Sequence, residues 1–574
     1  MLILFIFLYK MEHFTRFIFL LSLTMNIALL VESLPPYRNI MYYGDWSIYT
    51  GQRNFSPSQI DANLISHLIF AYLDLDSNGD LVLYDEYADF QIITLPELEG
   101  IKYGEPYGGV IGAISILKVK HPHLKIGISV GGKTSSEKFS EVAKDQVKRQ
   151  NFASNIAKFI NYIGYDFVDI DWRYSATIKE KDPDFTENYT LLLKEIRNGL
   201  NVYEKNGIRY ELSITMSSSP TMIDKIQFDK VLQIVSFANM LTYDLNGAWN
   251  SYTAHHTPLY TNEAYNPETM PEAQFSVDSC IRYLEETYEN SIDMTKIVIG
   301  VAPYTRGWGG VNDDGLDQNN PGLYATANTN SVKSADGTNS GVYGFHELQN
   351  LKKQFDLLEF FDNTAKAAYY YSPNNGYFFS CDNEESVAAK GKYVKEKELG
   401  GLVAWMASFD PENIIARAMF NSLYTKDYTF PERQLIYNLI SISAKIQATE
   451  NGYTFRIQNN AVLEETNSAL KRAELFRKYI LNVKIYITTE SGAKFGEGLN
   501  SGTVTNENGE VIIDPSSIPE SKIILPRFNS YGFSVTVSGT PDVNDIVTIS
   551  VSQRILPSLK EFKKRVIYDK RYKR

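Results

Sequence analysis

Between residues 37 and 426 the sequence alternates between short apolar runs and longer amphipathic segments. Eight of the runs have the length and composition of strands that are buried on both faces. They read NIMYYGDW, LISHLIFAYL, LKIGISVGG, YDFVDIDW, YELSITMS, IVSFANMLTYD, KIVIGVAPY and GGLVAWM. Helix-like segments such as QVKRQNFASNIAKFINYIG lie between most of them. Strand–helix units of this number and total length predict an α/β fold, a (β/α)8 TIM barrel.

The segment between the seventh and eighth predicted strands, about 305–396, is too long for a single crossover connection. It begins with the polar loop GGVNDDGLDQNNPG and carries the strand-like runs AAYYYSP and GYFFSC. We therefore expect a small α+β insertion domain within a barrel that spans 34–426. A doubly wound open sheet is the alternative, but no Gly-rich nucleotide turn follows the first predicted strand.

The pattern changes after Tyr428, and two segments there have the character of helices. In QLIYNLISISAKI the apolar residues recur with helical spacing, and AVLEETNSALKRAELFRKYI continues in the same style. The residues of the first stripe are Leu435, Leu439, Ile442 and Ile446. The sequence therefore predicts a helical connector over 427–480.

Beyond the predicted connector, the runs LNVKIYITT, GEVIID, GFSVTVSG and NDIVTISVS alternate with period two between turn residues. They predict a small β-sandwich over 481–553, which we interpret as an accessory or docking module that could contact a protein partner. The last segment, 554–574, is rich in Lys and Arg. We expect a solvated basic tail there, or else a docking arm for an acidic partner.

The N-terminal 33 residues have the pattern of a secretory signal. A mostly apolar run of 15 residues, FIFLLSLTMNIALLV, follows Arg16 and precedes a Pro-rich start. It is short for a membrane span and has a positive region before it. An uncleaved anchor is the alternative. We expect residues 1–33 to be removed, and the protein to be secreted and extracellular without further membrane association.

The charge and the Cys and His content of the chain limit which kinds of partner and metal it is expected to bind. The net charge is −12 and the isoelectric point about 5.3, which argues against nucleic acid. Cys280 and Cys381 stand about 100 residues apart without metal-ligand spacing, so two free thiols and one disulfide are both open. The seven histidines form no HExxH or similar cluster. We expect no metal and no cofactor.

The stretch YDFVDIDWRYS, residues 165–175, forms the fourth predicted strand and its end. Because side chains alternate along a strand, Asp169, Asp171 and Arg173 share one face. In a barrel that face points inward near the C-terminal mouth, where active sites lie. Alternatively, the two acids only satisfy backbone donors. Two close, buried acids cannot both be ionised without compensation.

DFVDIDWRY resembles the signature DGxDxDWEY of family 18 glycoside hydrolases, the chitinase family. Further motifs follow in the same order along 37–426. They are SVGG (129–132), LTYDLNGAW (241–249), YTRGWGG (304–310) and GGLVAWMASFD (400–410). The run SVAAKGKYVKEKELGGL is similar to bacterial chitinases that carry an inserted α+β domain. The resemblance implies a chitinase-like barrel.

The resemblance also implies roles for single residues. In that family hydrolysis is substrate-assisted, and the 2-acetamido carbonyl of the sugar attacks the anomeric carbon. By position, Asp171 matches the acid that orients this group, Asp169 its inner partner, and Tyr243 a further contact. Indoles at a barrel mouth suit sugar rings, because the rings have apolar faces. The residues expected to bind substrate are Trp46, Asp244, Trp249, Arg306 and Trp405.

Arg173 stands where the family signature has the glutamic acid that protonates the glycosidic oxygen. Its guanidinium has a pKa above 12 and cannot transfer a proton at working pH. Loss of general acid catalysis costs on the order of 10²- to 10⁴-fold in rate. We expect Arg173 to form a bidentate ion pair with Asp171 or Asp244. The sequence departs from the family pattern at Lys133, Phe167 and Ser175 as well.

Three functions follow as hypotheses. The first is a secreted, inactive chitinase-like protein that binds chitin or N-acetylglucosamine oligosaccharides. The second is a scaffold or assembly subunit with a vestigial cleft, by analogy with chitinase-like subunits of toxin complexes. The third is an active hydrolase with a displaced acid, Asp244 or Asp171. Retained tryptophans favour the first, and the extra C-terminal module favours the second.

Overall fold

A computed structural model describes residues 36–433 with short gaps, and it describes separate segments of the chain from 442 to 568. The gaps in the first part are 51–52, 100–107, 133–135, 174–183, 205–206, 314–318, 329–331 and 334–340. The predicted signal segment 1–33 lies outside the described residues. Among the described residues, no helix is long and apolar enough to cross a membrane.

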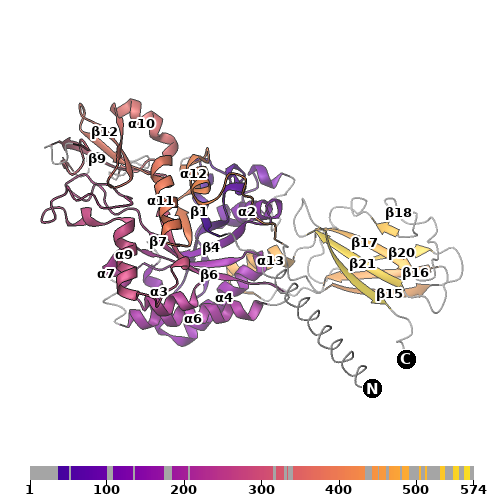
Figure 1. Ribbon diagram of the computed structural model, residues 1–574. Coiled ribbons are helices and arrows are strands. Elements are labelled where there is room, and N and C mark those ends of the chain that lie inside the picture. Colours follow the sequence, from indigo (N-terminus) through magenta and orange to yellow (C-terminus); the bar gives the residue numbers. More distant parts are fainter. Residues whose placement is uncertain are drawn as a thin grey trace, which may run out of the picture.

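Eight parallel strands close into a barrel, as predicted (Figure 1). Hydrogen bonding follows the order β1-β14-β8-β7-β6-β5-β4-β2, and β2 pairs with β1 to complete the ring. All eight predicted runs form these strands. They are β1 (Arg38–Gly44), β2 (His67–Leu75), β4 (Lys125–Gly131), β5 (Phe167–Asp171), β6 (Glu211–Ser217), β7 (Phe237–Leu241), β8 (Ile297–Val301) and β14 (Gly401–Ala404). A short strand, β3 (Leu81–Leu83), adds antiparallel to β2.

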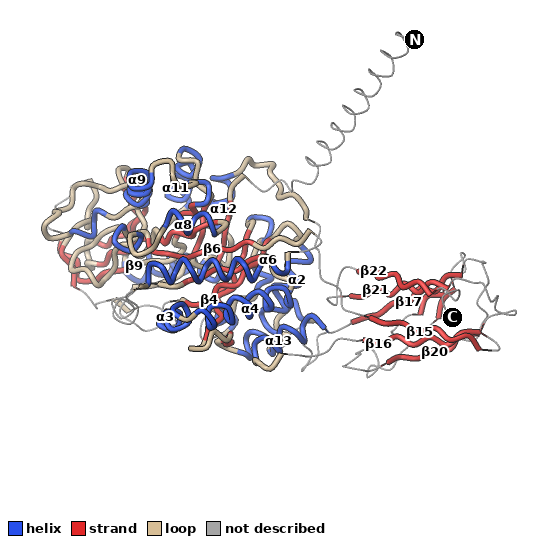
Figure 2. Tube along the Cα trace, turned by 90° about the horizontal axis from the view of Figure 1, so that it is seen from below, coloured by secondary structure: helices blue, strands red, loops and turns tan. Residues whose placement is uncertain are grey.

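Helices surround the barrel and cover its strands (Figure 2). Local sequence sets their ends: Asp145 caps α4 by accepting from the backbone N–H groups of Val147 and Lys148, and Gly164 ends it at φ 74°. The helices of this layer are α2 (Gly109–Lys120), α3 (Ser136–Lys144), α4 (Gln146–Ile163), α6 (Phe185–Tyr203), α7 (Pro220–Ile223), α8 (Phe228–Ile234), α9 (Val277–Tyr288), α11 (Glu384–Glu396) and α12 (Ile414–Leu423).

The predicted insertion follows β8. It is a five-stranded antiparallel sheet in the order β10-β9-β13-β12-β11. Its elements are β9 (Arg306–Asn312), β10 (Thr326–Asn328), α10 (Leu348–Phe355), β11 (Leu358–Asp362), β12 (Ala367–Ser372) and β13 (Tyr377–Ser380). The predicted end at 396 was too late, because α11 packs in the barrel core through Val387, Tyr393 and Val394.

The predicted helical connector is only partly correct. Residues Ile442–Thr449 form a strand, β15, where a helix was predicted, and they pair with β16 (Gly452–Asn459). Ile442 and Ile446, the last two residues of the predicted stripe, thus lie in a strand, and residues 434–441 lie outside the described part. A helix is present in the second half of the connector, α13 (Ser468–Lys478).

Strands extend across the rest of the C-terminal region in two antiparallel sheets (Figure 1). One sheet has the order β15-β16-β20 and the other β18-β19-β17-β21-β22. The strands not yet given are β17 (Leu481–Thr489), β18 (Thr503–Thr505), β19 (Val511–Ile513), β20 (Ser530–Thr536), β21 (Val547–Arg554) and β22 (Glu561–Tyr568). Residues 561–568, within the predicted basic tail, form a strand that pairs with β21. The strands thus begin before 481 and continue beyond 553.

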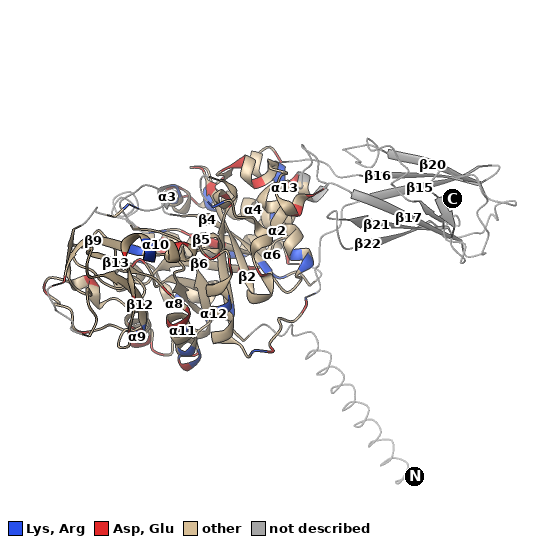
Figure 3. Cartoon of the chain, turned by 90° about the horizontal axis from the view of Figure 1, so that it is seen from above, with Lys and Arg blue, Asp and Glu red and all other residues tan. Residues whose placement is uncertain are grey.

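The structure also shows how the charged residues are distributed and whether the two cysteines are bonded. Figure 3 shows acidic and basic residues interspersed over the barrel rather than gathered on one side in that view. Cys280 and Cys381 are both buried and both free, so the disulfide alternative is excluded.

Candidate active site

The predicted site residues come together at the C-terminal ends of the barrel strands. Asp169 and Asp171 lie at the end of β5, and Tyr243 follows β7. Trp46 follows β1, and Trp405 follows β14. Strand alternation and barrel closure together place them at one mouth, since parallel strands all end on the same side.

Asp169 is fully buried at the centre of this group. Its carboxylate accepts hydrogen bonds at 2.7 to 3.4 Å, and every donor is a side chain from another strand of the barrel. The donors are Tyr42, Ser129, Ser213, Thr215 and Asn239. Burial raises the pKa of Asp169 above its ordinary value, and the nearby charge of Asp171 adds to this. The alternative that it only satisfies backbone donors is wrong, because these donors are hydroxyl and amide side chains.

Asp171 and Arg173 form a bidentate ion pair. The guanidinium donates from Nε to Oδ1 at 2.8 Å and from its second nitrogen to Oδ2 at 2.9 Å. Tyr72 donates a further hydrogen bond to Oδ2 at 3.1 Å. Burial opposes the charge of Arg173, but the Asp171 carboxylate outweighs it and raises the pKa of Arg173 above its ordinary value. Both oxygens of Asp171 therefore have donors from this chain.

Asp244 has partners of its own and does not pair with Arg173 by any hydrogen bond among the described contacts. Arg306 donates to it from Nε at 2.8 Å and from a terminal nitrogen at 2.7 Å, and Tyr304 donates at 2.7 Å. Burial alone would raise the pKa of Asp244, but His256 and Arg306 lower it far below the ordinary value. Arg306 thus ties the first strand of the insertion, β9, to the end of β7.

Aromatic rings form one wall of the mouth. Trp405 stacks on Tyr72 with ring centroids 5.9 Å apart, and Trp46 lies 6.2 Å from each of them. The peptide bonds before Tyr72 and after Trp405 are cis. Tyr72 was missed in the sequence analysis, although its place at the end of β2 could have indicated it. These rings border a cavity together with Arg173, Tyr243, Asp244, Tyr304 and Arg306.

The five tryptophans do not share one role. Trp249 is 56% exposed, and the Arg306 guanidinium lies over its ring at 5.2 Å. Trp308 lies away from the mouth and is fully buried in the core of the insertion domain. Trp172 is a core residue, buried between Phe139 and Tyr189.

Several predicted positions lie elsewhere. Lys133 and Ser175 lie outside the described residues. Phe167 is the first residue of β5, so it lies at the N-terminal end of the strand, away from the site. It is fully buried in the barrel interior. Among the described residues, no group of three or more His, Cys, Asp or Glu side chains is arranged to hold a metal ion.

Comparison with known proteins agrees with this geometry. The sequence model of glycosyl hydrolases family 18 matches residues 38–410, the barrel and its insertion. Chitinase A1 of Niallia circulans is 31% identical over 416 residues, which cover 66% of this chain and 57% of the relative. The protein belongs to glycoside hydrolase family 18.

Relatives of this family 18 protein include Chitinase 1 of Aphanocladium album, 27% identical over 65% of this chain and 81% of the relative. Among solved structures, chitinase ChiA74 from Bacillus thuringiensis shares the fold with a TM-score of 0.59 and 21% identity, over 93% of this chain and 100% of that chain. Ostrinia furnacalis Group IV chitinase, solved in complex with allosamidin, has a TM-score of 0.56 and 25% identity, over 67% and 97% of the two chains.

The family 18 barrel thus places Asp244, the buried Tyr243 and the paired Arg173 around one cavity. The arrangement can hold a neutral polar group through Tyr243 and stack an apolar face on Trp405. A proton donor with a suitable pKa is harder to find. Asp244 is held ionised, and Asp169 is fully enclosed.

Proposed function

We propose that this family 18 protein is a secreted chitinase-like protein that binds chitin or N-acetylglucosamine oligosaccharides in the barrel cleft without cleaving them. The observation that carries the proposal is the bidentate pair between Arg173 and Asp171. By its place in DFVDIDWRY, Arg173 takes the position of the family's general acid. The names of the relatives, which are chitinases, support the class of glycan.

Loss of the reaction follows from two properties of the pair. A guanidinium stays protonated at working pH and has no proton to give to a leaving oxygen. It also places a positive charge where an oxocarbenium-like cation would form, which raises the energy of that state. In addition, the Asp171 oxygens that would orient the acetamide of a bound sugar already accept from Arg173 and Tyr72.

Binding would use the parts of the cleft that do not depend on Arg173. The rings of Trp46, Tyr72 and Trp405 line the cavity and offer apolar surface to a sugar ring. Tyr243 and Asp244 border the same cavity and can hydrogen-bond sugar hydroxyl and acetamide groups. The packed barrel strands that carry these side chains hold them in place before a ligand arrives, which lowers the entropic cost of binding.

Hydrolysis by a displaced acid is the second candidate, since the chain's relatives are named as chitinases. Asp244 is a poor candidate for this acid. Arg306 and His256 lower its pKa, so it is ionised at neutral pH and cannot donate a proton. Asp171 is engaged by Arg173. The scaffold hypothesis depends on a protein partner for residues 442–568, and no contact described in the structure favours it.

Retention on chitin beads tests the binding proposal. The full chain is expected to be retained and to be eluted by N-acetylglucosamine oligosaccharides, and Trp405→Ala should reduce its affinity about tenfold by removing the stacked indole. Trp308→Phe is a matched control, because Trp308 lies in the insertion core. Equal retention of Trp405→Ala and the unsubstituted protein would contradict a sugar site in this cleft and favour the scaffold hypothesis.

A further inference from the structure

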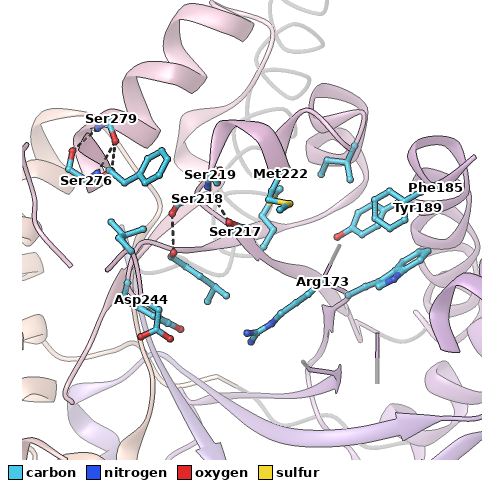
Figure 4. Close-up of a pocket in the computed structure, with 17 residues that line it drawn as sticks. Arg173, Phe185, Tyr189, Ser217, Ser218, Ser219, Met222, Asp244, Ser276 and Ser279 are labelled. Carbon is cyan, nitrogen blue, oxygen red and sulfur yellow. Dashed lines mark hydrogen bonds between the residues drawn. The ribbon is translucent and has the colours of Figure 1, made fainter. Parts of the chain in front are cut away.

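The cleft has two sides that the fold supports differently. On one side Arg173, Tyr189 and Asp244 surround the space, and they come from strand ends and a helix of the barrel (Figure 4). On the other side Trp46 lies on η1 (Asp45–Ile48), a single turn that follows β1. Whatever holds this turn in place therefore also holds one ring of the cleft wall.

The indole of Trp46 packs directly on the chain of its own turn. A Cβ added to Gly44 would lie 2.5 Å from the Trp46 ring, so only glycine fits there without a shift. The Trp46 backbone N–H donates to Oδ1 of Asp45 at 2.7 Å. The position of the ring thus depends on the backbone of the turn, and the Asp45 carboxyl group holds that backbone.

Asp45 lies against a second buried acid, Asp89, on η4 (Tyr87–Gln91). Asp45 is 3% exposed and Asp89 is fully buried. The two carboxyl groups are within hydrogen-bond reach of each other. No N–H or O–H of the described residues donates to Asp45 Oδ2 or to either oxygen of Asp89. Two such carboxylates cannot both be ionised in a buried site, so the pair must keep a proton that one acid donates to the other.

The titratable groups around the pair do not replace that proton. Asp85, which lies just before η4, is itself an acid, and its charge disfavours ionisation of both partners. The hydroxyl groups of Tyr43 and Tyr49 face the same acids, but they donate to the Phe55 carbonyl oxygen and to Asp85. Among the described residues, no cation is one of the groups that act most strongly on either acid.

The two turns are not equally free to move. At the start of α2, a Cβ added to Gly109 would lie 2.0 Å from the Asp89 carbonyl oxygen, so the helix packs closely on η4. Ala88 and Phe90 bury the same turn in the barrel core. Trp46 is only half-buried and borders the cleft. Repulsion between the two acids would therefore displace η1 rather than η4.

We propose that Asp89 is a positioning residue for Trp46, because the proton that it shares with Asp45 holds the turn that carries this ring. A hydrogen bond between a carboxyl group and a carboxylate is short and strong in a buried site. Loss of the last proton leaves two adjacent buried carboxylates, and the turn then carries Asp45 towards solvent. The movement of Trp46 is independent of the ligand, whereas its effect on glycan binding rests on the proposed function.

The sign of the pH dependence follows from the order in which the pair loses its protons. Burial raises the pKa of Asp45 to about 7 and that of Asp89 well above its ordinary value. At neutral pH the pair thus keeps the Asp89 proton, and the Asp45 carboxylate accepts it. The contact opens only when this second proton is lost, so the wall ring is held at acidic and neutral pH and released in the alkaline range.

Fluorine NMR of the full chain labelled with 5-fluorotryptophan measures the movement directly. The chain has five tryptophans, and the signal that is missing from Trp46→Phe belongs to Trp46. We expect this signal to move as the pH is raised from neutral into the alkaline range, before the protein unfolds. Asp89→Asn keeps a donor to Asp45 at every pH, so its Trp46 signal should stay in place. Glu141→Gln, at an exposed acid of α3, is the matched control and should behave like the unsubstituted protein.

Two results would overturn the proposal. One is a Trp46 signal that stays in place up to the pH at which the whole protein unfolds. The other is equal movement in Asp89→Asn, since no proton can then be lost at that position. If Asp89→Asn does not fold, Asp45→Asn supplies the donor from the other side of the pair and carries the same expectation.

Affinity for tri-N-acetylchitotriose over the same pH range measures the consequence for the cleft. It should fall about tenfold in the unsubstituted protein as the Trp46 signal moves, and it should stay constant in Asp89→Asn. Constant affinity of the unsubstituted protein while the signal moves would contradict a role of Asp89 in sugar binding. Movement of the signal in a protein that binds no sugar at any pH would refute the proposed function alone.

Discussion

The guanidinium of Arg173 donates to both oxygens of Asp171, at 2.8 and 2.9 Å. Such a pair is planar and directional, so it fixes the orientation of the carboxylate as well as its charge. Tyr72 supports the same oxygen from β2. The geometry leaves Asp171 with the role of a counter-ion rather than that of a free acceptor.

The substitution Arg173→Glu tests whether Arg173 is the reason that the site lacks a general acid. The substitution places a carboxyl group beside the buried Asp171, and mutual repulsion should keep one of the two protonated at neutral pH. We expect this variant to hydrolyse a fluorogenic chitobioside about 10²-fold faster than the rate measured without protein. Arg173→Gln, which releases Asp171 but supplies no acid, is the matched control and should stay inactive. Equal activity of the two variants would show that more than the acid is missing.

The partner of Arg173 could be predicted from the sequence only in part. Strand alternation put Asp169, Asp171 and Arg173 on one face and left Asp171 and Asp244 as possible partners for the arginine. The structure decides for Asp171, because Arg306 and Tyr304 hold Asp244. Arg306 comes from β9, more than 60 positions along the chain, and no local pattern reveals such a contact.

At the scale of elements, two short helical turns beside β1 bring carboxyl groups together. Asp45 begins η1 (Asp45–Ile48), next to Trp46, and Asp89 lies in η4 (Tyr87–Gln91). Both are buried. Burial raises the pKa of Asp45 to about 7 and that of Asp89 well above its ordinary value, with the charge of Asp45 adding to the second shift.

These shifts predict how stability depends on pH. The folded state holds a proton on Asp45 up to about pH 7, whereas the unfolded chain releases it near pH 4. Stability from this proton is thus full below about pH 4 and falls by about 1.4 kcal/mol per pH unit up to about pH 7. Urea unfolding of Asp45→Asn across this range should show a shallower fall. A slope identical to that of the unsubstituted protein would contradict the shared burial of these acids.

Element prediction succeeded where burial on both faces gave continuous apolar runs, as in all eight barrel strands. It failed over 442–449, because the same residues satisfy two periods. Ile442 and Ile446 fit a helical stripe, but Ile442, Ala444, Ile446 and Ala448 also alternate. Pairing with β16 decides for the strand, and short apolar segments cannot be separated by period alone.

At the scale of the whole molecule, helix α13, which follows the barrel in the chain, packs against the barrel. Ala469, Leu470, Ala473 and Phe476 are buried in the barrel's apolar core. Asn467 donates to the Leu81 carbonyl at 3.0 Å, and Lys158 pairs with Glu465 at 3.0 Å. The sequence placed a helix here but could not place it against α4 and β3, since its partners are distant in the chain.

Leu470→Ala should therefore destabilise the barrel, although it lies more than 40 residues after the last barrel helix. We expect a loss of about 3 kcal/mol in the free energy of unfolding, typical of a buried leucine. Lys471→Ala, on the exposed face of the same helix, is the matched control and should change it by less than about 0.5 kcal/mol. Denaturation followed by tryptophan fluorescence measures both, because all five tryptophans lie within 46–405. A small effect of Leu470→Ala would mean that α13 is not part of the barrel fold.

Turnover of a fluorogenic chitobioside by the purified, unsubstituted protein is the most direct measurement of the central claim. We expect that the sugar is bound, as competition on chitin beads would show, and that no fluorophore is released above the rate without protein. Release that Asp171→Ala abolishes would contradict it, because a cleft whose orienting carboxylate is held by Arg173 should not catalyse the reaction.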